Sequence, residues 1–331
     1  MTDSGSIERQ VSRARESVAA VRARVSSAFL GQTTVVDELL WALFADGHVL
    51  LEGAPGLGKT TLVRALADAL DLSFRRVQFT PDLMPADVLG TRILDEDAHG
   101  ARSFRFEKGP IFTHVLLADE INRATPRTQA ALLEAMAERQ VTVFGETHPL
   151  AAPFLVVATQ NPIEMEGTYP LPEAQLDRFL LQVDVAQPDL AGLVAILERT
   201  TGSNEPRGKA VLSRDELLAA RTLVRDVPVS RDVFELAARV VLATRPDDAS
   251  APDSVKRCVR YGASPRGAQA LILAAKARAL IEGRLFVSAD DVARVAPAAL
   301  RHRLILNYEA DAARVRRDDL VLDACRGAGR R

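Results

Sequence analysis

The stretch Gly53-Ala-Pro-Gly-Leu-Gly-Lys-Thr60 decides the fold, because it matches the pattern G-x-x-x-x-G-K-[ST]. The glycines of this pattern let the backbone curl, so that successive N–H groups point at phosphate oxygens. Lys59 then reaches the β- and γ-phosphates, and the hydroxyl of Thr60 ligates magnesium. The flanks fit, because residues 48–52 read as a short apolar strand and residues 60–70 as a helix. The sequence therefore predicts a site for ATP and Mg²⁺.

The residues expected to contact the nucleotide in and after this loop are Gly53, Ala54, Pro55, Gly56, Leu57, Gly58, Lys59, Thr60 and Thr61.

Two carboxylates follow a second apolar run further along the chain. Asp119 and Glu120 come directly after residues 114–118, and ligands of parallel α/β sheets bind outside the carboxyl ends of the strands. Asp119 suits a magnesium ion through its water shell, and Glu120 can polarise a water that attacks the γ-phosphate. Strands often end in acidic residues without any catalytic reason. The phosphate-binding loop nearby favours the catalytic interpretation.

A polar side chain also ends the next apolar run, residues 154–158. Asn161, followed by Pro162, can hydrogen-bond both the γ-phosphate and the attacking water, which positions the water rather than activating it. An ordinary Asn-Pro turn is the alternative interpretation.

Two arginines are candidates for contacts with the transferred phosphoryl group. Arg178 leads into the last expected strand of the first domain, and Arg266 follows Pro265, where a helix would begin. Developing negative charge calls for the planar, bidentate guanidinium group, supplied within the subunit or across an interface. A surface salt bridge is the alternative for each, and chemistry alone would not select them.

Strand and helix patterns alternate across the first half of the chain. Strands are predicted over residues 48–52, 74–79, 115–118, 154–158 and 180–183, and helices over residues 7–29, 34–45, 60–70, 85–89 and 126–139. This alternation implies a parallel sheet wound on both faces. Two hairpins are predicted as well, over residues 91–106 with Gly100 near the turn, and over residues 141–150 around Gly145.

Strand signals fade after Gln187-Pro188-Asp189, and helical patterns rich in Ala, Leu and Arg dominate residues 190–317, with a break over residues 202–208. We therefore expect two units. Residues 1–186 would hold the N-terminal helices and the α/β core, and residues 187–331 a smaller all-helical domain. The tail from Asp318 onward is expected to be frayed.

Composition excludes several classes of protein. With 47% hydrophobic and 26% charged residues, the 331-residue chain is typical of soluble globular proteins, and its net charge of −2 gives no reason to expect nucleic-acid binding. Cys258 and Cys325 lie far apart with no CxxC spacing, so neither a disulfide framework nor a zinc site is expected. The polar N-terminus and the strand-length apolar runs predict a cytoplasmic protein without membrane insertion.

Taken together, these segments resemble the MoxR family of AAA+ ATPases. The most specific match is Thr159-Gln-Asn-Pro-Ile-Glu-Met-Glu-Gly-Thr-Tyr-Pro-Leu-Pro-Glu-Ala-Gln-Leu-Asp-Arg-Phe179. Further matches are Leu117-Ala-Asp-Glu-Ile-Asn-Arg-Ala124, Thr128-Gln-Ala-Ala-Leu-Leu-Glu-Ala-Met136, Gly262-Ala-Ser-Pro-Arg-Gly267 and Leu300-Arg-His-Arg-Leu304. The resemblance runs from about residue 31 to about residue 306. Met165 and Gly267 depart from the pattern, at positions where a polar residue and alanine are common.

The resemblance implies an AAA+ module followed by a helical lid, assembled into a hexameric ring. Lys59 and Thr60 would be the Walker A pair, Asp119 and Glu120 the Walker B pair, and Asn161 sensor 1.

For the arginines, the resemblance implies that Arg178 is the arginine finger and Arg266 is sensor 2. Arg123 also lies near the strand ends and is an alternative finger. Gln32, after Gly31, matches a segment that borders the adenine. The two hairpins match insertions that face the pore or the partner in such rings.

MoxR-like proteins resemble chaperones that remodel or mature partner complexes, often with a von Willebrand factor A domain protein, and this is the function that the resemblance implies. An AAA+ motor acting on nucleic acid is one alternative, although we find no helix-turn-helix or zinc motif. A metal-insertion motor like the ATPase subunit of magnesium chelatase is another.

Overall fold

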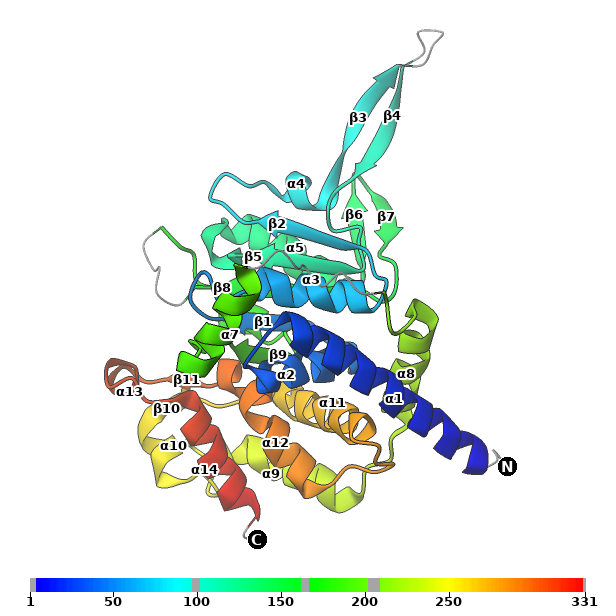
Figure 1. Cartoon of the computed structure of the whole chain (residues 1–331). Coiled ribbons are helices and arrows are strands. Elements are labelled where there is room, and N and C mark those ends of the chain that lie inside the picture. Colours follow the sequence, from blue (N-terminus) through cyan, green and yellow to red (C-terminus); the bar gives the residue numbers. More distant parts are fainter. Residues whose placement is uncertain (1–3, 97–101, 162–166, 202–208, 330–331) are drawn as a thin grey trace.

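The computed structural model describes residues 4–96, 102–161, 167–201 and 209–329 (Figure 1). The predicted turn at Gly100, the departure at Met165 and the break at residues 202–208 lie outside these ranges. The helices are α1 (Ser4–Ala28), α2 (Thr33–Phe44), α3 (Lys59–Ala69), α4 (Pro85–Leu89), α5 (Pro126–Glu138), α6 (Glu173–Leu176), α7 (Leu190–Thr200), α8 (Arg214–Asp226), α9 (Arg231–Ala243), α10 (Asp253–Cys258), α11 (Pro265–Ile281), α12 (Ala289–Leu300), α13 (Tyr308–Ala312), α14 (Arg317–Gly329), and the 3₁₀ turns η1 (Ile121–Arg123) and η2 (Arg301–Arg303). The strands are β1 (Val49–Glu52), β2 (Phe74–Gln78), β3 (Gly90–Glu96), β4 (Arg102–Lys108), β5 (Val115–Asp119), β6 (Gln140–Val143), β7 (Glu146–Pro149), β8 (Leu155–Gln160), β9 (Leu181–Asp184), β10 (Val259–Tyr261) and β11 (Ile305–Leu306).

A five-stranded parallel sheet forms the centre of the first half of the chain. Its strand order is β2-β5-β8-β1-β9, and every neighbouring pair is parallel. Parallel strands need crossover connections. α5 lies in the connection between the neighbours β5 and β8, and α3 lies in the connection from β1 to β2, which are not neighbours in the sheet. The carboxyl ends of all five strands therefore lie along one edge, and the loop after β1 opens between the ends of β8 and β9.

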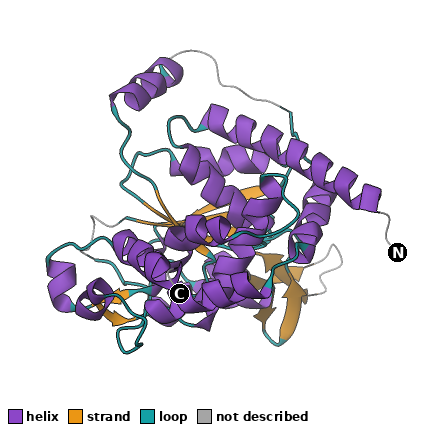
Figure 2. Cartoon of the chain, turned by 90° about the horizontal axis from the view of Figure 1, so that it is seen from below, coloured by secondary structure: helices purple, strands orange, loops and turns teal. Residues whose placement is uncertain are grey.

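Helices cover both faces of this sheet (Figure 2). Successive side chains of a strand point to opposite faces, so each buried strand presents apolar side chains to both layers of helices. One face packs with the apolar side chains of α1, α2 and α3 through Val49, Leu51, Val115, Leu117, Leu155 and Val157. The other face packs with α4 and α5 through Leu50, Leu116, Ala118, Val156 and Ala158. The predicted doubly wound parallel sheet is thus confirmed.

Two antiparallel hairpins project from the core (Figure 1). β3 pairs with β4, β6 pairs with β7, and the two hairpins contact each other. The ring of Phe106 stacks on His148 with centroids 4.1 Å apart, and Arg92 forms an ion pair with Glu146. Both hairpins lie over the residues where the sequence predicts them.

The second half of the chain is predominantly helical, as predicted, with two differences. β10 and β11 form a short antiparallel pair. Strands of three and two residues are too short to produce a recognisable pattern in the sequence. The expected frayed tail is wrong, because α14 extends to Gly329 and packs against α9 and α12. Its buried residues are Leu320, Val321, Ala324 and Ala328, a spacing that places them on one helix face.

The N-terminal helices contact both halves of the molecule. α1 packs against α3 of the core and α11 of the lid, and α2 packs against β9 and α11. A division between residues 186 and 187 stays a prediction, although β9 ends at Asp184 and α7 begins at Leu190.

Candidate nucleotide-binding site

The loop between β1 and α3 has the backbone conformation that its glycines permit. A Cβ on Gly53 would lie 2.7 Å from the carbonyl oxygen of Val185, the residue after β9, so the chain can pass this closely only with glycine. Gly58 has φ of 78°, in the left-handed region, and is the N-cap of α3. The loop therefore ends at the N-terminus of a helix, where unpaired backbone N–H groups favour anions.

Lys59 lies across this loop. Its Nζ donates a 2.5 Å hydrogen bond to the carbonyl oxygen of Gly53. Burial lowers the pKa of the Lys59 ammonium group, and the charges of Asp119 and Glu120 oppose this shift. The lysine is thus within electrostatic range of both carboxylates at the end of β5.

Asp119 is the last residue of β5 and is almost fully buried. Its Oδ1 accepts a 2.6 Å hydrogen bond from the hydroxyl of Thr159 on β8. Its Oδ2 accepts two hydrogen bonds from Arg76 on β2, of 2.6 Å from Nη2 and 3.0 Å from Nε. Neighbouring strands on both sides therefore fix the orientation of this carboxylate.

Glu120 follows directly, with φ of 56° and ψ of 50°, a left-handed conformation that is unusual for a residue with a side chain. Its backbone N–H donates a 2.8 Å hydrogen bond to the hydroxyl of Thr159. Its Oε2 accepts hydrogen bonds from Gln78 (2.7 Å) and from Nη1 of Arg123 (3.2 Å). The turn directs the two adjacent carboxylates to different partners.

Asn161 lies where β8 ends and is buried. Because Glu52 and Gln160 are register partners, Asn161 lies at the level of the start of the phosphate-binding loop. The structure therefore brings the ends of β1, β5 and β8 together, as the sequence predicts for the loop, the two carboxylates and Asn161.

The side chains of Arg178 and Arg266 are exposed. Arg178 follows α6, and its Nη1 donates a 3.0 Å hydrogen bond to the carbonyl oxygen of Leu133 on α5. Arg266 is in the first turn of α11, where its backbone N–H donates to the hydroxyl of Ser264. Arg123, the alternative finger, is paired with Glu120 of its own chain.

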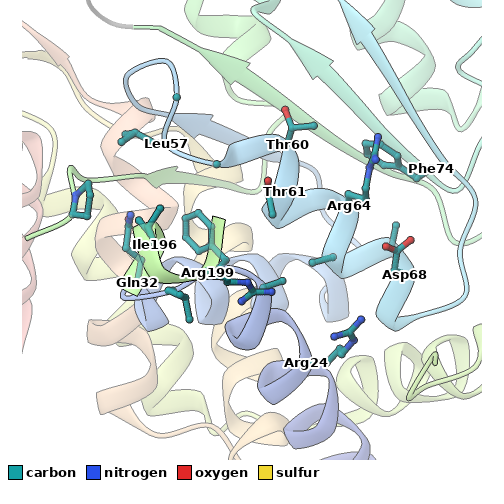
Figure 3. A pocket seen from close by; sticks show the side chains of 18 of the residues that line it. Arg24, Gln32, Leu57, Thr60, Thr61, Arg64, Asp68, Phe74, Ile196 and Arg199 are labelled. Carbon is teal, nitrogen blue, oxygen red and sulfur yellow. The ribbon is translucent and has the colours of Figure 1, made fainter. Parts of the chain in front are cut away.

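A cavity of about 1560 Å³ lies beside the loop (Figure 3). Of the predicted contact residues, those that line it are Gln32, Pro55, Gly56, Leu57, Gly58, Thr60 and Thr61. The other predicted residues, including Lys59, Asp119, Glu120, Asn161, Arg178 and Arg266, are not part of its lining. Gln32 also donates a 3.0 Å hydrogen bond from Nε2 to the carbonyl oxygen of Ala186.

The cavity has two further walls that the sequence did not indicate. One wall is formed by Arg24 and Ala28 at the end of α1 together with Phe29 and Leu30, which follow it. The other is formed by Leu193, Ile196 and Arg199 of α7. The ring of Phe29 also lies 3.6 Å from where a Cβ on Gly58 would be. Apolar residues at helical spacing in both segments predict a buried helix face, but they do not identify the element that covers it.

Metal-ligand clusters and membrane-spanning helices are both absent from the described ranges. Within them, no cluster of three or more His, Cys, Asp or Glu side chains could hold a metal ion. No described helix has the length and apolar character needed to cross a membrane.

Comparison with known proteins gives the family. Residues 48–181 match the model of the ATPase family associated with various cellular activities (AAA), and residues 251–324 match the AAA lid domain. The chain is 45% identical over 286 residues to Chaperone MoxR1 of Mycobacterium tuberculosis, covering 86% of this chain and 75% of that protein. It is 33% identical to Protein MoxR of Methylorubrum extorquens, covering 94% and 93% of the two chains.

A solved structure supports the same assignment. The crystal structure of a candidate ATPase from Cytophaga hutchinsonii superposes with a TM-score of 0.90 at 38% identity, covering 98% of this chain and 97% of that one. Family membership implies nucleotide binding together with a metal ion. This chain is a member of the MoxR family of AAA+ ATPases.

Proposed function

We propose that the chain binds ATP with Mg²⁺ between α1, α3 and α7 and hydrolyses it in a ring of identical subunits. The observation that carries this proposal is the hydroxyl of Thr159. It donates to the carboxylate of Asp119 and accepts from the backbone N–H of Glu120, so one group orients both acidic residues beside the phosphate-binding loop. These hydrogen bonds satisfy buried polar groups, and they also hold both acidic residues in fixed orientations before the reaction, as electrostatic catalysis requires.

The phosphates would be held by Lys59 and by backbone N–H groups of residues 53–61 other than Pro55, which has none. The hydrogen bond from Lys59 to Gly53 would be exchanged for β- and γ-phosphate oxygens, which a partly desolvated ammonium group binds strongly. Gln32 and the ends of α1 and α7 would border the base.

The oxygen donors beside the loop fit Mg²⁺, which usually takes only one or two protein ligands in addition to phosphates and water. Thr60 and Asp119 are the residues that would hold it. When bound, the ion would neutralise charge on the β- and γ-phosphate oxygens.

Glu120 would accept a proton from the attacking water. The water oxygen forms a bond to the γ-phosphorus, the bond from that phosphorus to the β–γ bridging oxygen breaks, and ADP and phosphate result. Asn161 would hold the water in line by hydrogen bonding, and would not take its proton.

Arg266 would contact the γ-phosphate within the subunit, and Arg178 would reach the site of the neighbouring subunit. The exposure of both side chains leaves them available for such contacts. Arg123 is less suited to act across an interface, because its guanidinium is paired with Glu120 of its own chain.

A ring interface is supported by the outer face of α7. Leu190, Val194 and Leu197 are 81%, 45% and 51% exposed, and their spacing of four and three residues places them on one helix face. Because α7 also lines the cavity through Ile196 and Arg199, a neighbour packed on α7 would lie next to the nucleotide. We assign six subunits by family resemblance.

ATP turnover would drive remodelling or maturation of a partner protein complex, together with a von Willebrand factor A domain protein. The support is the family and the name of the chaperone relative at 45% identity. In this account the chain works in the cytoplasm and does not act on nucleic acid.

Steady-state hydrolysis at increasing protein concentration tests the enzyme. We expect specific activity to rise with concentration, and Glu120→Gln to bind ATP but turn it over about 100-fold more slowly or worse, as for loss of a catalytic base. Glu138→Gln, an exposed site on α5, is the matched control. A wild-type rate of hydrolysis in Glu120→Gln would contradict the proposed role of Glu120 as the catalytic base.

The partner is tested by capture from the source cells. Glu120→Gln with ATP should retain a von Willebrand factor A domain protein that Lys59→Ala, impaired in nucleotide binding, does not retain. Equal recovery of proteins by both variants would contradict the remodelling function.

A further inference from the structure

The candidate finger Arg178 is adjacent to a residue that is tied to the lid at two points. Oδ1 of Asp177 accepts a 2.6 Å hydrogen bond from Nε of Arg303 in η2. Oδ2 of the same carboxylate accepts a 2.9 Å hydrogen bond from the hydroxyl of Ser264, the N-cap of α11. Both partners belong to the lid, and the second lies two residues before Arg266.

The lid also holds the backbone on both sides of Arg178. Arg303, almost fully buried, donates from Nη2 to the carbonyl oxygens of Phe179 (2.8 Å) and Asp177 (3.3 Å), and from Nη1 to that of Leu180 (3.2 Å). His302 Nε2 lies 3.2 Å from the same Phe179 oxygen. The segment that carries Arg178 is thus attached to η2 by a buried charge and several directed hydrogen bonds.

The Ser264 hydroxyl links this attachment to Arg266. It accepts a 3.1 Å hydrogen bond from the backbone N–H of Arg266 while it donates to Asp177. Arg266 is therefore linked to Arg178 in three steps. Its backbone N–H is bonded to the Ser264 hydroxyl, that hydroxyl is bonded to the Asp177 carboxylate, and Asp177 is joined to Arg178 by a peptide bond. Every step of this path is a directed contact, so movement of the α11 N-terminus must be followed by the Arg178 segment or break a hydrogen bond.

Gly267 explains how α11 can lie so close to η2. A Cβ at this position would be 3.3 Å from Cδ of Arg303, 3.0 Å from Leu300 and 3.1 Å from Ala263. Burial lowers the pKa of the Arg303 guanidinium, Asp177 raises it in opposition, and the positive charge of Arg266 lowers it further. Arg266 is therefore within electrostatic range of the residue that holds the finger segment.

We propose that Asp177 and Ser264 are positioning residues that make the sensor Arg266 and the finger Arg178 move as one unit. A lid that shifts when Arg266 contacts the nucleotide of its own subunit then shifts Arg178 in the site of the neighbouring subunit. The nucleotide state of one site is passed to the next through two hydrogen bonds. This inference rests on the proposed roles of Arg178 and Arg266.

The test uses Ser264→Ala, because Asp177→Asn leaves the buried Arg303 without its charge partner and is expected to unfold part of the chain. Ser264→Ala should lower kcat about tenfold, the worth of one hydrogen bond to a charged group. The dissociation constant for ADP should stay within about twofold, because Ser264 acts through Arg178 and not on the bound nucleotide. Ser264→Thr, which keeps the hydroxyl, should restore kcat.

Loss of a helix cap alone is controlled by Ser230→Ala. Ser230 caps α9 in the same way, accepting from the backbone N–H of Val233, and it has no bond to the core among the described contacts. This variant should keep the wild-type kcat. A tenfold loss in Ser230→Ala would reduce the Ser264 effect to helix capping and overturn the proposal.

A double-mutant cycle separates this inference from the proposed function. In an Arg178→Ala background, Ser264→Ala should have no further effect on kcat, measured by single turnover, since the residue it positions is absent. Multiplicative effects, or an unchanged kcat in Ser264→Ala alone, would overturn the coupling and leave the finger assignment intact. Wild-type kcat in Arg178→Ala would instead overturn the finger assignment, and the coupling with it.

Discussion

The side-chain amide of Gln78 on β2 donates a 2.7 Å hydrogen bond to Oε2 of Glu120 at the end of β5. Arg123 donates to the same oxygen. Hydrogen bonds to a carboxylate stabilise its ionised form, so these two donors oppose the transfer of a proton from water to Glu120. Gln78 and Arg123 therefore restrain the Glu120 side chain through one oxygen.

Gln78→Ala removes one of the two donors and should raise basal ATP turnover, by about two- to tenfold for a single hydrogen bond from an exposed side chain. The measurement is steady-state hydrolysis at a protein concentration above that of ring assembly. Gln140→Ala, at an exposed glutamine of β6, is the control and should leave turnover unchanged. Slower hydrolysis in Gln78→Ala would mean that this hydrogen bond assists Glu120.

Arg76 occupies Oδ2 of Asp119, the residue proposed to hold Mg²⁺. Because a guanidinium and a metal ion compete for one carboxylate, Arg76→Ala should lower the Mg²⁺ concentration that gives half-maximal hydrolysis, by about two- to fivefold for a partly exposed pair. The check is an Mg²⁺ titration at fixed ATP. Arg75→Ala, on the adjacent exposed position of β2, is the control, and a raised Mg²⁺ requirement in Arg76→Ala would contradict the competition.

Thr159 should be needed for catalysis more than for nucleotide binding. Thr159→Val keeps the shape but leaves the Glu120 N–H and one oxygen of Asp119 without this partner, so kcat should fall at least tenfold and stability by about 1–3 kcal/mol. Thr159→Ser should restore both. Turnover, ATP affinity and denaturant unfolding are compared for the three proteins, and an unchanged kcat in Thr159→Val would remove the observation that carries the proposed function.

Glu38 on α2 gives a pH dependence of stability. Burial raises the pKa of its carboxyl from 4.5 to about 7. The folded state therefore binds the Glu38 proton more tightly than the unfolded state does. The stabilisation from the neutral carboxyl is fully present below about pH 4.5 and is lost as pH rises through 7. Glu38→Gln, which stays neutral, should therefore be more stable than wild type at pH 8 by up to about 3 kcal/mol, and equal to it near pH 4.5.

Denaturant unfolding at the two pH values checks this prediction, with Glu138→Gln as a control at an exposed carboxylate. The same stability difference at both pH values would show that the Glu38 carboxyl does not titrate in this window.

Features that depend only on residues close together in the sequence could be predicted. The phosphate-binding loop, the five core strands and both hairpins lie where the residue pattern places them, because glycine spacing and apolar runs are local properties. α14 shows the opposite case. Its charged first turn, with Asp318 and Asp319, resembles a solvated end, and only the packing of α9 and α12 supplies the surface that buries Leu320 and Val321.

Several residues around the candidate site that the sequence did not indicate come from elements that carry no predicted site residue. Arg76 and Gln78 belong to β2, and their proximity to Asp119 and Glu120 depends on β2 pairing with β5. The cavity walls formed by α1 and α7 depend in the same way on how these helices pack against the rest of the chain. Sequence spacing carries no information on which strand neighbours which, so these contacts require the structure.

The most direct test of the account is a mixture of two inactive proteins, Arg178→Ala and Glu120→Gln. If active sites are completed across subunit interfaces, a mixed ring contains sites with an intact Glu120 on one subunit and an intact Arg178 on its neighbour, about a quarter of all sites in a random 1:1 assembly. We expect mixing to restore ATP hydrolysis to about a quarter of the wild-type rate. Hydrolysis that stays at the level of the separate variants would contradict it, and recovery with Arg123→Ala in place of Arg178→Ala would assign the finger to Arg123.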